Sequence, residues 1–129
     1  MLTTAPCPCG SGRAAGACCM PFIEGRAHAP TAEALMRARY TAWVLERFDY
    51  LRATWHPATC PAALDAIPGL RWLGLSIRRV EAGGSDDARG VVEFVARSKQ
   101  DGRATRQHET SHFARIAGRW VYVRGEFDA

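Results

Sequence analysis

The sequence lacks the features that would direct a chain into or across a membrane. It has no run approaching the roughly 20 apolar residues that span a bilayer. Its opening stretch, MLTTAPCPCG, has neither the basic start nor the apolar core of a signal peptide. We therefore expect a cytoplasmic protein without membrane insertion, built as one domain with at most a small appendage.

Motifs of common catalytic and nucleic-acid chemistry are also missing. The 129 residues show no Ser-His-Asp order, no glycine-rich phosphate loop and no carboxylate pair in a catalytic context. The net charge of +4 comes from arginines spread along the chain, and RRVEAGGSDDARG mixes both signs. A nucleic-acid module typically gathers its basic residues on one face with stacking aromatics. Nucleic-acid binding is therefore only the third function that we consider.

What the sequence does have is a cluster of cysteines. Four of its five cysteines lie in CPCGSGRAAGACC. In a reducing compartment such clusters are more often metal ligands or redox groups than disulfides, and adjacent thiols close a disulfide only by distorting their peptide. Two pairs of thiolates joined by an eight-residue loop could supply four sulfurs to a tetrahedral zinc ion. The spacings are tighter than is usual for zinc, so spacing alone leaves a redox role or cross-links between the pairs open.

The rest of the chain predicts helices followed by strands. TAEALMRARYTAWVLERF predicts a helix over 31–48 with Thr31 as its N-cap, and FDYLRATWHP a short helix with Asp49 as its N-cap. PAALDAIPG predicts a turn or a further short helix. Four later runs predict strands joined by hairpins, at 70–82, 90–99, 105–117 and 119–127. This order predicts an α+β fold in which N-terminal helices pack in a curved antiparallel sheet.

Two interpretations of that sheet stay open, because alternation places apolar groups on both of its faces. Either the outer face is partly buried in a partner, or some of the aromatic side chains line a cavity.

The cysteine segment resembles the SEC-C motif, the short zinc-binding segment at the tail of the bacterial translocase motor SecA. With PTAEALMRARYTAWVLERFDYLRATWHP, WLGLSI, VEFVAR, HETSHF and GRWVYV after it, the chain is similar to the YchJ family of small bacterial proteins. The resemblance implies a zinc knuckle and linker over 1–29 and a cone-shaped nuclear transport factor 2-like domain over 30–129. It also implies a structural Zn²⁺ ion held by Cys7, Cys9, Cys18 and Cys19.

The same resemblance implies a zinc-binding adaptor that recognises a protein, such as an export chaperone or the ribosome. SEC-C segments commonly carry a lysine and an aromatic residue between the cysteine pairs, where this chain has Arg13 followed by AAGA. That difference bears on partner contacts rather than on the metal.

The alternative function is an enzyme or binding protein that takes a small apolar ligand into the cone. Nuclear transport factor 2-like domains include both enzymes and binding modules, so the fold leaves enzymatic activity uncertain. Because no catalytic residue carries over from the resemblance, the sequence favours a binding module. His56 fits a helix end better than a catalytic role, and Glu93 with Arg97 fits an ion-pair ladder. Glu109 and His112 are further titratable candidates. The candidate cavity residues are Tyr40, Trp43, Trp55, His56, Trp72, Glu93, Arg97, His108, Trp120 and Tyr122.

Overall fold

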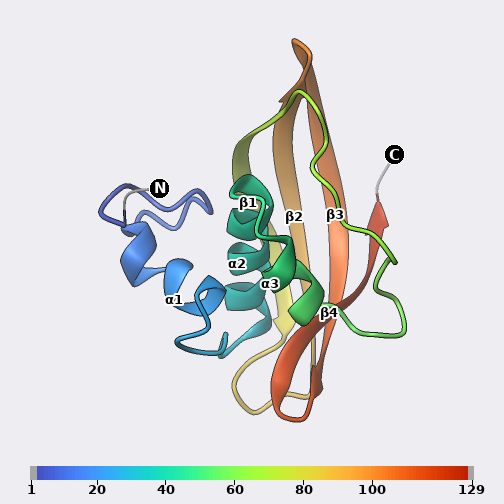
Figure 1. Cartoon of the computed structure of the whole chain (residues 1–129). Coiled ribbons are helices and arrows are strands. Elements are labelled where there is room, and N and C mark those ends of the chain that lie inside the picture. The colour runs from blue at the N-terminus through green and yellow to red at the C-terminus, as the bar shows by residue number, and fades with distance from the viewer. Residues whose placement is uncertain (1–2, 128–129) are drawn as a thin grey trace.

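Short helices precede a single sheet in the computed structural model, which describes residues 3–127 (Figure 1). The helical elements are the 3-10 turn η1 (Ala15–Ala17), α1 (Met20–Ile23), α2 (Ala32–Val44) and α3 (Phe48–Ala53). The strands are β1 (Leu70–Ala82), β2 (Arg89–Gln100), β3 (Arg103–Ile116) and β4 (Arg119–Phe127). All four strands pair antiparallel in the order β1-β2-β3-β4. The predicted α+β fold class is confirmed.

A tight turn sets the register at the centre of the sheet. Asp101 and Gly102 join β2 to β3 with φ angles of 51° and 84°. A two-residue hairpin turn of this hand needs two left-handed residues, which glycine supplies freely and aspartate tolerates. Pairing then runs without a shift from Gln100 opposite Arg103 to Arg89 opposite Ala114. This register decides which side chains face α2, because a slip of one residue would exchange the two faces.

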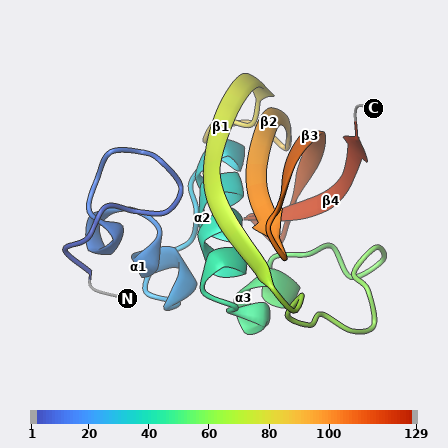
Figure 2. The same cartoon turned by 90° about the horizontal axis from the view of Figure 1, so that it is seen from above.

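The sheet curves around α2. Irregular pairing occurs in β1 between Trp72 and Gly74 and between Ile77 and Arg79, where one residue is left over each time. Such bulges bend a strand and increase its twist. Figure 2 shows the result, with the four strands fanning around one side of α2.

Helix α2 begins where the sequence predicts and ends early. The Thr31 side chain accepts a hydrogen bond from Ala34 N at 3.0 Å, which is the predicted N-cap. The helix stops at Val44 because Glu46, at φ 57°, takes a left-handed conformation. The predicted continuation to residue 48 is therefore wrong.

The chain after α2 corrects one detail of the prediction and decides between two alternatives for another. Asp49 does not cap α3, which begins at Phe48; its carboxylate instead accepts hydrogen bonds from Arg47 Nε and Nη2 at 3.1 and 3.0 Å. Residues 61–69 form no helix, but the predicted turn is present at Pro68 and Gly69, where Leu70 N donates to Ile67 O at 3.2 Å; the rest is an irregular loop. No helix of the described residues is long and apolar enough to span a membrane.

Both sides of α2 are covered. Figure 2 shows the N-terminal segment, residues 3–29, on one side of the helix and the sheet on the other. The small residues Ala38, Thr41 and Ala42 of α2 have no solvent exposure. Side chains of the N-terminal segment, of α2 and of the sheet together form a single hydrophobic core. The packing of the cysteine cluster is thus tied to the packing of the main helix.

Candidate metal centre

The first cysteine pair lies on a small closed loop. Cys7 and Cys9 follow Pro6, which forms an isolated antiparallel bridge with Ala14 at the base of the loop. The amide of Gly10 donates to Cys7 O at 3.2 Å. Gly10 has a φ of 78°, so the chain turns sharply behind Cys9. A Cβ atom at Gly10 would lie only 3.3 Å from a backbone oxygen of β1, and the loop tip therefore packs close to the sheet edge.

The second pair lies at the junction of two short helical turns. Cys18 ends η1, and its amide donates to Ala15 O at 3.1 Å. Cys19 is the N-cap residue of α1, where its carbonyl accepts hydrogen bonds from Phe22 N and Ile23 N, both at 3.1 Å. Backbone hydrogen bonds therefore fix the position of both residues that carry the second pair of thiols.

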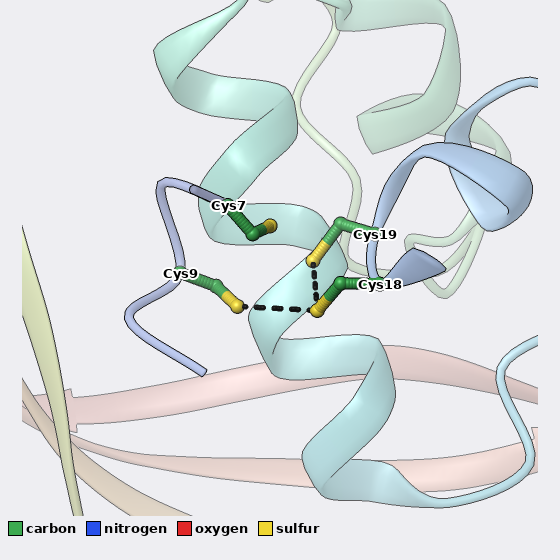
Figure 3. A group of neighbouring side chains, drawn as sticks. All are labelled: Cys7, Cys9, Cys18 and Cys19. Atoms are coloured by element: carbon green, nitrogen blue, oxygen red, sulfur yellow. Dashed lines mark hydrogen bonds between the residues drawn. The ribbon is translucent and has the colours of Figure 1, made fainter. Parts of the chain in front are cut away.

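The two pairs converge on one point (Figure 3). The four sulfur atoms lie within 4.8 Å of one another, and all four residues are buried. Cys18 Sγ is 3.6 Å from Cys9 Sγ and 3.8 Å from Cys19 Sγ. Four sulfurs bound tetrahedrally to zinc at about 2.3 Å would lie roughly 3.8 Å apart, so this spacing fits the ion. All the cysteines are free thiols.

Helix α2 forms the wall behind the cluster. The Sγ atom of Cys7 lies 3.6 Å from the buried Thr41 hydroxyl, and Arg37 Nη1 donates to Cys9 O at 2.8 Å. Four thiolates around a divalent ion carry a formal charge of −2, which a neighbouring cation offsets. The structure places Arg37 in that position, whereas Arg13 on the connecting loop is exposed.

The electrostatics of the cluster favour a bound cation. Hydrogen bonds with Cys7 and Cys9, together with burial, raise the pKa of the Cys19 thiol. Hydrogen bonds from Cys19 and Cys9 lower the pKa of the Cys7 thiol. The thiols thus compete for protons, and a divalent ion relieves that competition because it binds thiolates. With four protein ligands such a site has no open position, which is typical of a structural metal centre.

A second candidate site lies in the cone, between α2 and the concave face of the sheet. This cone cavity has a volume of about 260 Å³. Half of the predicted cavity residues line it: Tyr40, Trp43, Trp55, Trp72 and Tyr122. Its other lining residues are Met36, Arg39, Ile67, Phe94, Ala96, Gln107, Glu109, Ser111 and Phe127.

Three other predicted cavity residues do not line the cone cavity, which corrects the expectation for them. Phe94 and Ala96 point toward α2, so Glu93 and Arg97 on the same strand point to the convex face. His108 joins them there, with its Nε2 atom 2.7 Å from Glu93 Oε2. Glu93 also accepts a hydrogen bond from an arginine of β1, which makes this face an ion-pair ladder.

The cavity lining also excludes Trp120 and the other two histidines singled out above, His56 and His112. His112 lies on the convex face with its Nε2 atom 2.6 Å from Glu126 Oε1, so it and His108 have different carboxylate partners. His56 follows α3, and its amide donates to Tyr122 O at 2.8 Å. Trp120 borders a different pocket, of about 530 Å³, between α1, α3 and β4.

Sequence reasoning missed Arg39, Gln107 and Ser111. Arg39 follows Leu35 by one helical turn and so lies on the apolar stripe of α2, which is a usable signal. The two polar residues of β3 alternate with His108 and His112, and they face the opposite side of the sheet. The strand pattern showed that these residues share one face of β3. Only the register of the sheet shows that this face is the one toward the core.

Comparison with protein families matches both parts of the chain. The model described as "YchJ, middle NTF2-like domain" matches residues 31–125. The SEC-C motif model matches residues 4–21, which include all four clustered cysteines. The cone therefore has the nuclear transport factor 2-like fold that the resemblance implied.

Several proteins are similar along nearly the whole chain. A UPF0225 protein of Chromobacterium violaceum is 56% identical over 125 residues, which cover 94% of this chain and 92% of the relative. One from Streptomyces coelicolor is 48% identical over 126 residues, 98% of each chain. The solution structure of a SEC-C motif containing protein from Rhodopseudomonas palustris, 33% identical, matches with a TM-score of 0.84 over 97% of this chain and 100% of that one. A crystal structure from Psychrobacter arcticus, 26% identical, matches with a TM-score of 0.78 over 100% of this chain and 86% of the other.

Proposed function

The chain belongs to the YchJ family and carries a SEC-C motif ahead of its nuclear transport factor 2-like domain, and from this we propose that it is a zinc-binding adaptor. In this proposal the metal is structural. It fixes the N-terminal segment against α2, and the segment then presents its outer surface to a protein partner.

One observation carries the metal half of the proposal: four buried thiols meet within 4.8 Å. They come from two backbone-fixed turns that are separate in sequence. A packed core has no other evident reason to bring four titratable groups to one point, since each would be costly to ionise there alone. Zinc is the preferred ion because thiolate ligands in a closed tetrahedral set favour it.

Thiol reactivity tests the metal half. In protein purified without added metal, we expect Cys60, which is half-buried outside the cluster, to be the reactive thiol, and we expect four more thiols to react after chelation. The Cys60→Ser variant should react only after chelation. Five reactive thiols before any chelator is added would contradict the proposal.

The partner half rests on analogy with the SEC-C tail of SecA, and the proposed partners are an export chaperone or the ribosome. The surface offered is the exposed loop between the cysteine pairs, which includes Gly12, Arg13 and Ala17. Co-sedimentation with purified ribosomes and titration with a purified export chaperone test this half. We expect either the ribosome or the export chaperone to bind the metal-loaded chain. The same partner should bind the Cys60→Ser variant, which keeps the metal site, and should not bind Cys9→Ser, which loses it. Failure of both to bind the metal-loaded chain would refute these partners and leave the metal site standing.

A further inference from the structure

None of the four clustered cysteines lines the cone cavity, which combines aromatic walls with a polar floor. Side chains of α2 and β1, among them Tyr40, Trp43 and Trp72, form much of the wall. The volume of about 260 Å³ is slightly below the range of roughly 300–1,000 Å³ for small-molecule pockets. An occupant must therefore be small, of about one aromatic ring and a short substituent.

Glu109 is the acidic group of the floor. The residue is buried, and a Cβ atom at Gly125 would overlap its Oε2 atom, so the carboxylate is held closely on that side. Oε2 accepts hydrogen bonds from Ser111 Oγ and, at 3.1 Å, from Tyr122 Oη. Oε1 accepts one from Gln107 Nε2 at 3.2 Å. These donors are all neutral, and Oε1 retains capacity for one more donor.

Arg39 is the basic group of the same cavity. The residue is 3% exposed, and its guanidinium carbon lies 4.8 Å from the ring centres of both Trp55 and Tyr122. Nη1 donates to Leu51 O and to Thr54 Oγ1, each at 2.8 Å. Within residues 3–127 the hydrogen bonds of Arg39 come from Nη1 alone, so donors on Nε and Nη2 remain for another acceptor.

Two buried opposite charges thus face one cavity without forming a direct ion pair among the described residues. Tyr122 separates them: its ring packs on Arg39, and its hydroxyl bonds Glu109. The Nε1 atom of Trp55, a residue that borders both this cavity and the pocket beside Trp120, is buried without a hydrogen-bond partner in the described part of the chain. Donors on Arg39 and an acceptor on Glu109 therefore stay available to a molecule in the cavity.

The chemistry of the floor selects the class of that molecule. An anion would be attracted by Arg39 but repelled by Glu109, and a cation the reverse. A hydrocarbon would leave both groups without compensation for lost water. A neutral head that carries an acceptor beside a donor satisfies both groups at once. We propose that the cone cavity binds a small, ring-sized neutral molecule with such a head, as in a primary amide or a lactam, its acceptor on Arg39 and its donor on Glu109.

Four probes built on one benzene ring test this class: benzamide, benzoate, benzylamine and toluene. The four tryptophans give the readout through their indole N–H resonances in NMR titrations. Trp43, Trp55 and Trp72 line the cavity, whereas Trp120 lies outside it with its Nε1 atom 3.2 Å from Pro30 O. We expect benzamide to shift the three cavity resonances at millimolar concentration and to leave Trp120 unchanged. The two charged probes and toluene should bind at least tenfold more weakly.

Two matched variants locate the polar head. Glu109→Gln removes the charged acceptor, and Glu93→Gln makes the same change on the convex face of the sheet. Glutamine still offers a neutral acceptor, and a hydrogen bond to a charged group contributes about 1 kcal/mol more than one to a neutral group, so Glu109→Gln should weaken benzamide binding by roughly 5–10-fold. Glu93→Gln should bind benzamide as the unmodified chain does.

Three results would overturn the proposal. One is the absence of any shift in the cavity indoles with benzamide. Another is equal binding of benzamide and toluene, which would describe a purely apolar cavity. The third is equal affinity in the two glutamine variants. If Glu109→Gln does not fold, Ala96→Leu provides the variant test, because its larger side chain would fill the cavity and should abolish benzamide binding.

Discussion

Replacing Cys9 by serine is expected to release the metal and to expose residues 3–29 to trypsin, with cleavage after Arg13 and Arg26. The physical reason is that a three-sulfur set no longer closes the tetrahedral site. Structural zinc contributes about 10–16 kcal/mol to the folding free energy of zinc-finger peptides. Truncating a buried leucine costs less, about 2–5 kcal/mol. The melting temperature should also fall, since Thr41 and its neighbours on α2 lose their cover.

The matched control for Cys9→Ser is Cys60→Ser, the same change outside the cluster. It should keep the metal, the protease resistance and the melting temperature of the unmodified chain. Equal behaviour of the two variants would contradict a metal-dependent fold of the N-terminal segment. The division of the chain at residue 29 stays a prediction, and this experiment bears on it: a sheet that survives in Cys9→Ser favours a separable segment, whereas global unfolding favours an integral part of the core.

The second large effect is expected from Arg39→Met, with a loss of about 1.5–3 kcal/mol in the free energy of unfolding, the contribution of a hydrogen bond from a charged group. Methionine fills much of the space but removes the Arg39 donor from Leu51 O and the buried positive charge that shares a cavity with Glu109. Burial lowers the pKa of Arg39 to about 10, which means that the buried charge itself destabilises the folded state. Removing this charge therefore offsets part of the stability lost with its hydrogen bonds. Chemical denaturation measures the difference.

Two comparisons make the Arg39 result specific. Arg47→Met removes an arginine whose pair with Asp49 is largely exposed, and it should cost at most about 1 kcal/mol. The double variant Arg39→Met with Glu109→Leu removes both buried charges and should be more stable than the sum of the two single effects predicts. An Arg39→Met protein as stable as Arg47→Met would show that the buried charges do not interact as described.

Local chemistry made much of this fold predictable. The Thr31 cap and the hairpin at Asp101 and Gly102 each depend on residues a few positions apart. The cysteine cluster was visible for the same reason, because its pairs are close in sequence.

What the sequence did not predict depends on distant contacts. The early end of α2 requires Glu46 in a left-handed conformation, although the local residues are compatible with a longer helix. The assignment of Glu93 and His108 to the convex face, and of Glu109 to the cavity, requires the register of β2 against β3 and the position of α2. A buried arginine such as Arg39 is unexpected from composition, since arginines are mostly exposed.

X-ray absorption at the zinc edge tests the central claim most directly, on protein purified from cells without added metal. The account predicts one zinc per chain with four sulfur neighbours at about 2.3 Å and no nitrogen or oxygen ligand. A chain without zinc, or a zinc ion with fewer than four sulfur ligands, would contradict the assignment of Cys7, Cys9, Cys18 and Cys19 as a closed structural site.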